Sequence, residues 1–350
     1  MNCKNYNIDK YLYIYAYCLL GKGQRRFSIY NSIMDKIHLF DVSYYKFVKL
    51  FRKKKLSSIY FQYRDERSDI DYLIRFLLDN ELARIVDDIN LFPEIKTEWD
   101  FPYNVKRALI DIQNTFHDMK DIFAQLTALS CHTVEIRFFR AISASDLLRV
   151  TNGLTHEIIQ SIIFILPYQE DYLNGNFYSV MNKMVEEDHR FSFFLYNTPA
   201  HLIQTSQDLI NKEYLSLSLA ILFSEKKIVD CTNCGVIDYQ NFFAVSIEKY
   251  MENKLFNSCL NRQISIDVNG SIKNCPSMNK IWGNIAETSL QQIYDSADFR
   301  KLWTITKDKI KICNKCELRY LCPDCRAFTI TPNDIFSKPK KCNYDPTKLL

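Results

Sequence analysis

Glycine is scarce in this sequence, with only seven glycines among 350 residues, whereas an average protein contains about 7% glycine. No two glycines are adjacent, and no glycine-rich loop of the kind that cradles phosphate groups can be found. This scarcity excludes a recognisable phosphate-binding loop and a dinucleotide-binding fingerprint.

An excess of charge and long apolar runs are also missing. The sequence has 45 Lys and Arg residues and 41 Asp and Glu residues, which gives a net charge of +4. This charge is too small to indicate a nucleic-acid-binding surface. The longest apolar stretches, Ser161–Tyr168 and Tyr214–Phe223, fall short of the roughly 18 residues that a membrane span needs. The N-terminus lacks the features of a secretory signal. We therefore expect a soluble, cytoplasmic protein without a nucleic-acid or membrane partner.

The pattern of apolar residues divides the chain into three regions. Residues 1–95 mix short strands with amphipathic helices, which favours a small winged-helix-like module. Residues 96–225 alternate strands and helices, which predicts an α/β fold with a parallel sheet, either open or as a partial barrel. Residues 226–350 form a cysteine-rich domain.

The same periodicity predicts individual elements. Strands are expected at 9–17, 57–63, 133–139, 161–166, 191–196 and 215–223. Helices are expected at 40–50, 69–80, 105–116, 118–130, 145–151, 169–187 and 287–303. In strand 133–139, Glu135 and Arg137 alternate with apolar residues, so they either form a structural ion pair or face the interior of a barrel.

Cysteine is abundant and unevenly distributed, since nine of the twelve cysteines lie in the last 120 residues. These nine are Cys231, Cys234, Cys259, Cys275, Cys313, Cys316, Cys322, Cys325 and Cys342. Between Cys259 and Cys275, alternating apolar residues flank Asn269-Gly270, which predicts a β-hairpin with a type I′ turn. Such a hairpin would bring Cys259 and Cys275 together at its open end.

Three interpretations of these cysteines compete. Disulfides require an oxidising compartment, and no export signal is visible. Tetrahedral zinc sites use C-x2-C pairs, and Cys313, Cys316, Cys322 and Cys325 taken alone would favour zinc. Seven spaced cysteines with two more upstream can instead supply two sites of four thiolates each, as iron–sulfur clusters require.

The spacing Cys259-x10-Gly270-x4-Cys275, followed by Cys313-x2-Cys316-x5-Cys322-x2-Cys325 and Cys342, resembles the SPASM domain of radical S-adenosylmethionine enzymes. The family usually has three residues, not two, before the cysteine that matches Cys325. The resemblance implies two auxiliary [4Fe–4S] clusters. Carried over by motif position, Cys259, Cys275 and Cys325 would hold the first, with Cys231 or Cys234 as fourth ligand. Cys313, Cys316, Cys322 and Cys342 would hold the second.

Two motifs of the radical S-adenosylmethionine enzymes are missing. The sequence contains no C-x3-C-x2-C triplet and no Gly-Gly-Glu run, so we do not expect it to use S-adenosylmethionine as a cofactor. A radical-type barrel in the middle region would therefore be degenerate. No catalytic residue can be assigned.

The chain as a whole resembles the SPASM-domain peptide maturases of grasp-with-spasm systems. Besides the cysteines, the resemblance rests on the segments CLLGKGQRRF at 18–27, EWDFP at 98–102 and CHTVEIRFF at 131–139. It implies a maturation factor for a ribosomally synthesised peptide, with a precursor whose leader peptide binds the N-terminal module and an ATP-grasp ligase as partners. The alternative is a zinc-stabilised, peptide-binding adaptor without a redox or catalytic role.

Overall fold

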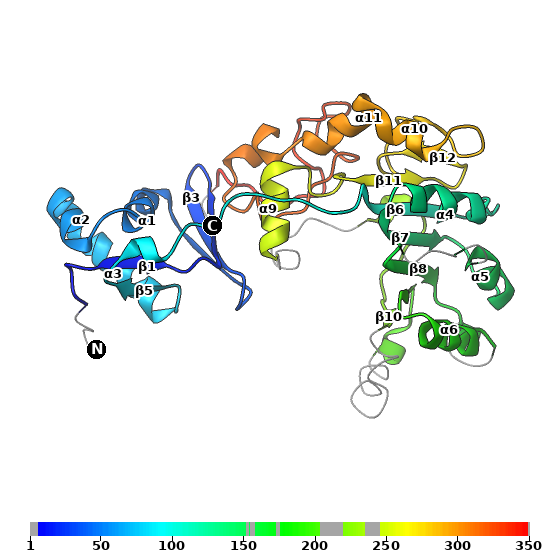
Figure 1. Ribbon diagram of the computed structural model, residues 1–350, viewed down its shortest axis with the longest axis horizontal. Coiled ribbons are helices and arrows are strands. Elements are labelled where there is room, and N and C mark those ends of the chain that lie inside the picture. Colours follow the sequence, from blue (N-terminus) through cyan, green and yellow to red (C-terminus); the bar gives the residue numbers. More distant parts are fainter. Residues whose placement is uncertain are drawn as a thin grey trace. The chain divides into compact units, whose positions relative to one another are not determined.

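The computed structural model describes residues 6–151, 154, 158–172, 176–203, 220–234 and 246–348. The chain forms two compact units (Figure 1). Unit 1 comprises residues 1–99, 236–258 and 305–350, and unit 2 comprises residues 100–235 and 259–304. The cysteine-rich region predicted at 226–350 thus contributes to both units. None of the helices in the described ranges is long and apolar enough to cross a membrane.

The N-terminal part of unit 1 has a three-stranded antiparallel sheet followed by three helices. The strands of this sheet, in spatial order, are β2 (Cys18–Lys22), β3 (Arg26–Asn31) and β4 (Lys36–Asp41). The helices are α1 (Tyr45–Phe51), α2 (Leu56–Gln62) and α3 (Arg67–Asp79). A separate antiparallel pair joins β1 (Tyr11–Ile14) to β5 (Ala83–Val86). The buried faces of these elements share one apolar core.

Segment 57–63 was predicted as a strand, and this prediction is wrong, because residues 56–62 form helix α2. Its aromatic and β-branched residues have high strand propensity. However, Leu56, Ile59 and Tyr60 follow one another at helical intervals, and all three are buried. The burial of one helical face therefore outweighs the local propensity. The helix expected at 69–80 is confirmed as α3.

Unit 1 also contains α9 (Ile247–Leu255) and the loops of residues 305–348. Leu19 and Tyr30 of the N-terminal sheet share a buried cluster with Tyr250, Met251 and residues of the loop 318–322. Short 3₁₀ turns complete the unit at Val42–Tyr44, Arg64–Glu66, Ile89–Leu91, Lys307–Lys309 and Cys313–Lys315.

A buried ion pair fastens the N-terminal sheet to the cysteine-bearing loop. Arg26 Nε lies 2.7 Å from Glu317 Oε1, and Glu317 is completely buried. Ser28 Oγ donates a hydrogen bond of 2.8 Å to the carbonyl oxygen of Glu317. The backbone of Gly21 lies so close to the Glu317 carbonyl group that a Cβ atom at residue 21 would be only 1.9 Å from the carbonyl oxygen. Only glycine allows this approach.

Unit 2 is built on an eight-stranded sheet of order β10-β9-β8-β7-β6-β11-β12-β13. The neighbours from β10 to β11 pair in parallel, and β12 and β13 extend the sheet in antiparallel fashion. The strands are β6 (Val105–Ile112), β7 (Cys131–Phe138), β8 (Ser161–Pro167), β9 (Phe191–Tyr196), β10 (Ile221–Phe223), β11 (Gln263–Ile266), β12 (Ser271–Lys273) and β13 (Gly283–Asn284). This arrangement confirms an α/β fold with a mainly parallel sheet.

Helices α4 (Met119–Ala128), α5 (Ala144–Thr151) and α6 (Asn176–Glu187) lie on one side of this sheet (Figure 1). Helices α4 and α5 confirm the helices expected at 118–130 and 145–151. Helix α6 confirms the later part of the helix expected at 169–187, and the earlier part contains a 3₁₀ turn at Glu170–Tyr172. The strands expected at 133–139, 161–166 and 191–196 are also confirmed. The strand expected at 215–223 is present as β10, and its earlier residues lie outside the described ranges.

Two helix predictions in unit 2 need correction. Residues 105–112 form the central strand β6, not a helix. The expected helix at 287–303 is broken into α10 (Leu290–Asp295) and α11 (Ala297–Lys301), with a 3₁₀ turn at Leu302–Thr304. The break occurs because Ser296 has an extended backbone and its side chain caps α11.

The sheet face opposite the helices carries paired charges. Arg137 of β7 donates from Nε and Nη2 to the two carboxylate oxygens of Asp111 on β6, at 2.7 and 2.9 Å. Burial raises the pKa of Asp111, although the neighbouring guanidinium opposes this shift. Of the two alternatives for Arg137, the structure therefore shows an ion pair.

We expect Gly21→Ala to destabilise unit 1, because the added methyl group would collide with the Glu317 carbonyl. Overpacking of this kind costs about 1–3 kcal/mol. Ser28→Ala removes one hydrogen bond at the same oxygen, so it should cost only about 1 kcal/mol. Thermal unfolding of both variants would measure the difference. Equal stability of Gly21→Ala and the wild type would contradict this close contact.

Candidate metal centres

We define the loop cysteines as Cys313, Cys316, Cys322 and Cys342, all of which lie in unit 1. Cys313 begins the 3₁₀ turn Cys313–Lys315, and the Cys316 N–H donates to the Cys313 carbonyl oxygen at 3.0 Å. Cys313 and Cys322 are both buried, whereas Cys316 and Cys342 are half-buried. The C-x2-C spacing thus places two thiols on a single tight turn.

The loop cysteines influence one another electrostatically. Burial raises the pKa of Cys313 to about 11 and that of Cys322 to about 12. Negative charge on Cys342 adds to both shifts. Burial raises the pKa of Cys316 as well, and the negative charges of Glu317, Cys322 and Cys313 add to that shift. Each of the four sulfur atoms therefore lies within electrostatic range of at least two of the others. Without a bound metal, the thiols of Cys313, Cys316 and Cys322 remain protonated at neutral pH, so metal binding would release protons.

A buried lysine stands beside the loop cysteines. Lys307 is 3% exposed, and its Nζ donates to the Cys322 carbonyl oxygen at 2.5 Å and to Ser258 Oγ at 3.1 Å. Its charge lowers the pKa of Cys313 and Cys322 and so opposes the effect of burial. This cation would stabilise thiolates or an anionic cluster at the same place.

We define the hairpin cysteines as Cys231, Cys234, Cys259 and Cys275, all of which lie in unit 2. Burial raises the pKa of Cys275 to about 12, and negative charge on Cys259 and Cys234 adds to this shift. Ser277 Oγ donates to the Cys231 carbonyl oxygen at 2.7 Å, which holds the upstream segment against the end of the hairpin. Both upstream cysteines therefore lie near the hairpin, and both stay candidates for the fourth ligand.

The hairpin between Cys259 and Cys275 is confirmed as β11 and β12, but its turn differs from the predicted type I′ turn. A type I′ turn needs positive φ at both central residues, whereas Gly270 has φ 79° and Asn269 has no positive φ. The Gly270 N–H donates to the Asp267 carbonyl oxygen, and the Asp267 carboxylate accepts from the N–H groups of Asn269 and Ser271. The carboxylate thus stabilises a longer turn.

A chain of hydrogen bonds connects the hairpin to strand β6. Arg107 Nε donates to Gln263 Oε1 at 3.0 Å, and Gln263 Nε2 donates to the Asn274 carbonyl oxygen at 2.8 Å, one residue before Cys275. The negative charges of Glu135, Cys259 and Cys275 all raise the pKa of Arg107. Arg107 is therefore a cation within electrostatic range of Cys259 and Cys275.

Cys325, which the motif assigns to the first centre together with Cys259 and Cys275, lies in unit 1. It is half-buried and contacts the same apolar cluster as Cys316, Cys322 and Cys342. Its role as a ligand of the first centre stays a prediction.

The donor atoms fit iron–sulfur clusters, because both groups consist of thiols, the soft ligands that hold such clusters. Among the described residues, no three His, Cys, Asp or Glu side chains lie close enough to hold a single metal ion. When bound, an iron–sulfur cluster would supply electron transfer or a structural cross-link. The chain's own contribution is two cations, Arg107 and Lys307, each of which lies within electrostatic range of thiols in its own unit.

Sequence reasoning missed Arg107, Gln263 and Lys307. Gln263 offered one signal, since this glutamine lies four residues after Cys259 at the start of a strand in which Ile264 and Ile266 alternate with polar residues. Arg107 offered none, because its segment was interpreted as a helix. Lys307 precedes the C-x2-C pair by six residues and looks like any exposed lysine in the sequence.

Comparison with known proteins identifies part of this region. Residues 258–317 match the family profile of SPASM, described as an iron–sulfur cluster-binding domain. This segment is similar to the SPASM domain. It includes Cys259, Cys275, Cys313 and Cys316, and it confirms the family resemblance on which the cysteine assignment was based. No curated protein sequence matches the chain.

Among solved structures, the chain is similar to SuiB from Streptococcus suis. The structures of SuiB bound to S-adenosylmethionine and to its precursor peptide SuiA each share 13% identity with this chain, with a TM-score of 0.36. A further SuiB structure shares 12% identity, with a TM-score of 0.37. In all three cases the match covers 95% of this chain and 100% of SuiB.

We expect Cys259→Ala and Cys316→Ala each to lower the iron content of anaerobically purified protein, because each removes one thiolate from a different group. The double variant should lose the sum of the two single losses. Cys131→Ala is the matched control, since Cys131 is buried in β7 and belongs to neither group. Iron and acid-labile sulfide per chain are the quantities to measure. Unchanged iron in Cys316→Ala would show that the loop cysteines are not ligands.

The charges beside the hairpin cysteines should affect a bound cluster in opposite directions. Arg107→Gln removes a cation and should make the reduction potential more negative. Glu135→Gln removes an anion, 3.4 Å from Arg107 Nη1, and should make the potential more positive. A redox titration followed by EPR would measure both shifts. Shifts of the same sign would indicate that the substitutions disturb the packing rather than the charge.

Proposed function

We propose that this protein is a cytoplasmic maturation factor for a ribosomally synthesised peptide. In this proposal the N-terminal module is winged-helix-like and binds the leader segment of a precursor peptide. The SPASM region carries two [4Fe–4S] clusters, and an ATP-grasp ligase modifies the peptide that the protein presents. The observation that carries the proposal is the match of residues 258–317 to the SPASM family, together with the cysteines that both units contribute.

The two-cluster assignment follows the motif. The loop cysteines would hold one cluster, and their mutual electrostatic influence supports this set. Cys259, Cys275 and Cys325 would hold the other, with Cys231 or Cys234 as its fourth ligand. The influence of Cys234 on Cys275 supports a ligand from the upstream segment. Because no C-x3-C-x2-C triplet exists, the proposal includes no cleavage of S-adenosylmethionine.

The edge of the N-terminal sheet supports binding of a leader peptide. β4 is the end strand of the sheet, and an end strand presents unpaired N–H and C=O groups that an extended peptide can pair with. The rings of His38 and Phe40 on β4 contact Phe76 of α3, at 5.3 and 5.0 Å between ring centroids. Peptide side chains that alternate along an added strand could therefore reach α3.

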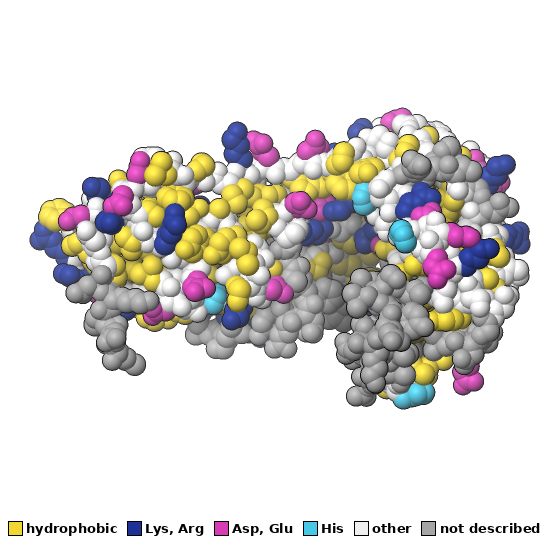
Figure 2. All heavy atoms as spheres, turned by 60° about the horizontal axis from the view of Figure 1, so that its bottom comes forward, with side chains coloured by type: hydrophobic (Ala, Val, Ile, Leu, Met, Phe, Trp, Pro, Cys, Tyr) yellow, Lys and Arg dark blue, Asp and Glu magenta, His cyan; other side chains and the backbone are white. Residues whose placement is uncertain are grey.

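Residues along α3 and at its C-terminal end line an open surface depression of about 530 Å³. Tyr72 and Arg75 contribute to its lining beside Phe76, and Tyr72 is 53% exposed. Hydrophobic side chains gather over the N-terminal part of unit 1 on the face seen in Figure 2. An exposed aromatic side chain next to an edge strand is a suitable anchor point for a peptide.

The metal content distinguishes the proposal from the zinc-stabilised adaptor. We would purify the protein anaerobically and determine iron, acid-labile sulfide and zinc, together with an EPR spectrum of the reduced protein. About eight irons with equal sulfide support two [4Fe–4S] clusters. One or two zinc ions without sulfide would exclude the clusters and leave the adaptor.

We expect Tyr72→Ala to weaken binding of a synthetic precursor peptide about tenfold, because loss of one aromatic contact costs roughly 1–2 kcal/mol. Phe61→Ala is the matched control, since Phe61 of α2 is 71% exposed and does not line the depression. Fluorescence anisotropy with a labelled peptide would give both dissociation constants. Equal affinity in the two variants would place the leader elsewhere.

A further inference from the structure

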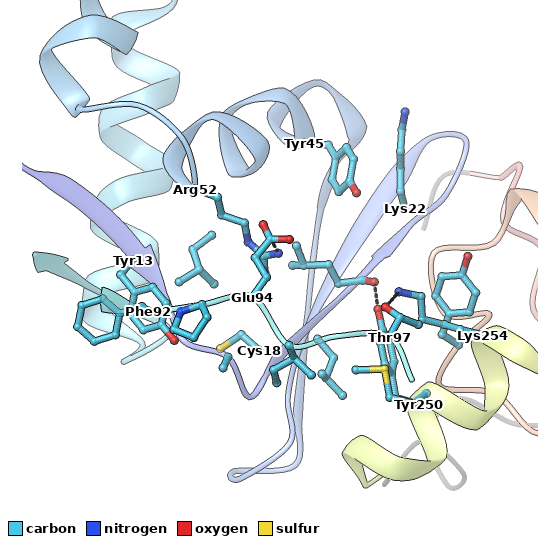
Figure 3. Close-up of a pocket in the computed structure, with 18 of the residues that line it drawn as sticks. Tyr13, Cys18, Lys22, Tyr45, Arg52, Phe92, Glu94, Thr97, Tyr250 and Lys254 are labelled. Atoms are coloured by element: carbon cyan, nitrogen blue, oxygen red, sulfur yellow. Dashed lines mark hydrogen bonds and ion pairs between the residues drawn. The ribbon is translucent and has the colours of Figure 1, made fainter. Parts of the chain in front are cut away.

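Unit 1 contains a cavity of about 550 Å³ that no part of the proposed function uses (Figure 3). Strands β1 and β2, helices α1 and α9, the segment 89–97 and the loop at 319–320 form its walls. Its volume is within the range in which proteins hold small ligands. The labelled rings are Tyr13, Tyr45, Phe92 and Tyr250.

The charges of this cavity are unbalanced. Lys22, Arg52, Lys254 and Arg319 line it, whereas Glu94 is the single carboxylate in the lining. Arg52 lies 3.6 Å from Glu94, and the two side chains point toward each other in Figure 3. Arg319 pairs with Asp308, which lies outside the lining, at 2.6 Å. In the described part of the chain, no carboxylate lies within 4 Å of Lys22 or Lys254.

Lys254 is the cation best placed to receive an anion. It is half-buried, and its Nζ donates to Thr97 Oγ1 at 3.2 Å. The same nitrogen lies 5.4 and 5.6 Å from the ring centroids of Tyr250 and Tyr320. Burial lowers the pKa of Lys254; the negative charge of Asp308 opposes this shift, and the charges of Arg319 and Arg52 add to it. A carboxylate beside Nζ would relieve the cost of this poorly solvated charge.

The aromatic walls complement the charge. The rings of Tyr13 and Phe92 stack at 4.4 Å between centroids, and they form an apolar surface for the body of a ligand. The lining contains neither a glycine nor the start of a helix of eight residues or more, so the backbone cradle that typically holds phosphate is absent from it. These features favour a carboxylate that is attached to an apolar or aromatic body.

From this geometry we infer that the cavity binds an acidic, aromatic-containing peptide segment, with its carboxylate against Lys254 and its apolar part against Tyr13 and Phe92. The inference deepens the proposed function, because such a segment would belong to a precursor peptide. The cavity wall at Arg319 and Tyr320 lies between Cys316 and Cys322 in the sequence. An occupant would therefore contact the loop that carries two loop cysteines.

Calorimetry with the full-length protein tests this inference. The probe is acetyl-Asp-Phe-Asp-amide, and acetyl-Asn-Phe-Asn-amide is its uncharged counterpart. We expect measurable binding of the acidic tripeptide, weakened at least about tenfold by Lys254→Met and by replacement of both Asp residues with Asn. Lys53→Met is the control, since Lys53 is exposed, does not line the cavity and changes the net charge equally.

Three results would overturn the inference. The two tripeptides could bind with equal affinity, or the acidic tripeptide could bind the wild type and Lys254→Met with equal affinity. Succinate could also bind as tightly as the acidic tripeptide. Succinate would indicate a site for small free carboxylates. Lys22→Met provides a second variant on an exposed side chain if Lys254→Met does not fold. The tripeptide assay needs neither a cluster nor a precursor. Failure of tripeptide binding would therefore leave Tyr72-dependent precursor binding intact. Failure of Tyr72-dependent precursor binding would likewise leave tripeptide binding intact.

Discussion

The buried ion pair between Arg26 and Glu317 is the contact on which the architecture of unit 1 depends. Glu317 is completely buried and follows Cys316 directly, so its carboxylate needs a cation at close range. Arg26 supplies this cation, and the Tyr344 hydroxyl hydrogen-bonds with both side chains. Removal of either charge would leave the other one buried and unpaired. The N-terminal sheet and the cysteine-bearing loop therefore fold as one structure.

The hairpin cysteines depend on the parallel sheet in a comparable way. β11 pairs with β6 in parallel, and the side chain of Gln263 connects Arg107 to the backbone beside Cys275. Lys273 pairs with Asp267 at 2.7 Å and stabilises the far end of the hairpin. The central strands of unit 2 therefore determine the positions of Cys259 and Cys275.

The sequence predicted most elements of the parallel sheet and the cysteine hairpin, because these features have strong local signals. It failed where tertiary position outweighs propensity. Ala108, Ile110 and Ile112 of β6 alternate with Arg107, Leu109 and Asp111, but Lys, Arg, Ala and Leu are good helix formers, so the segment looked helical. Only its place between β7 and β11 makes it a strand. Arg107 and Lys307, which influence the thiols electrostatically, reach them only through the folded structure, and a single sequence does not reveal such proximity.

The same loop links three features of unit 1. It carries Cys316 and Cys322, it contributes Glu317 to the ion pair with Arg26, and Arg319 and Tyr320 form a wall of the cavity. Any ligand that binds only the folded arrangement stabilises it by mass action. A cluster on the loop cysteines would therefore favour the shape of the cavity. Linkage is reciprocal, so an acidic peptide in the cavity would favour retention of the cluster by the same free energy. Metal binding and peptide binding are thus expected to be coupled through residues 316–322, even where no electron is transferred.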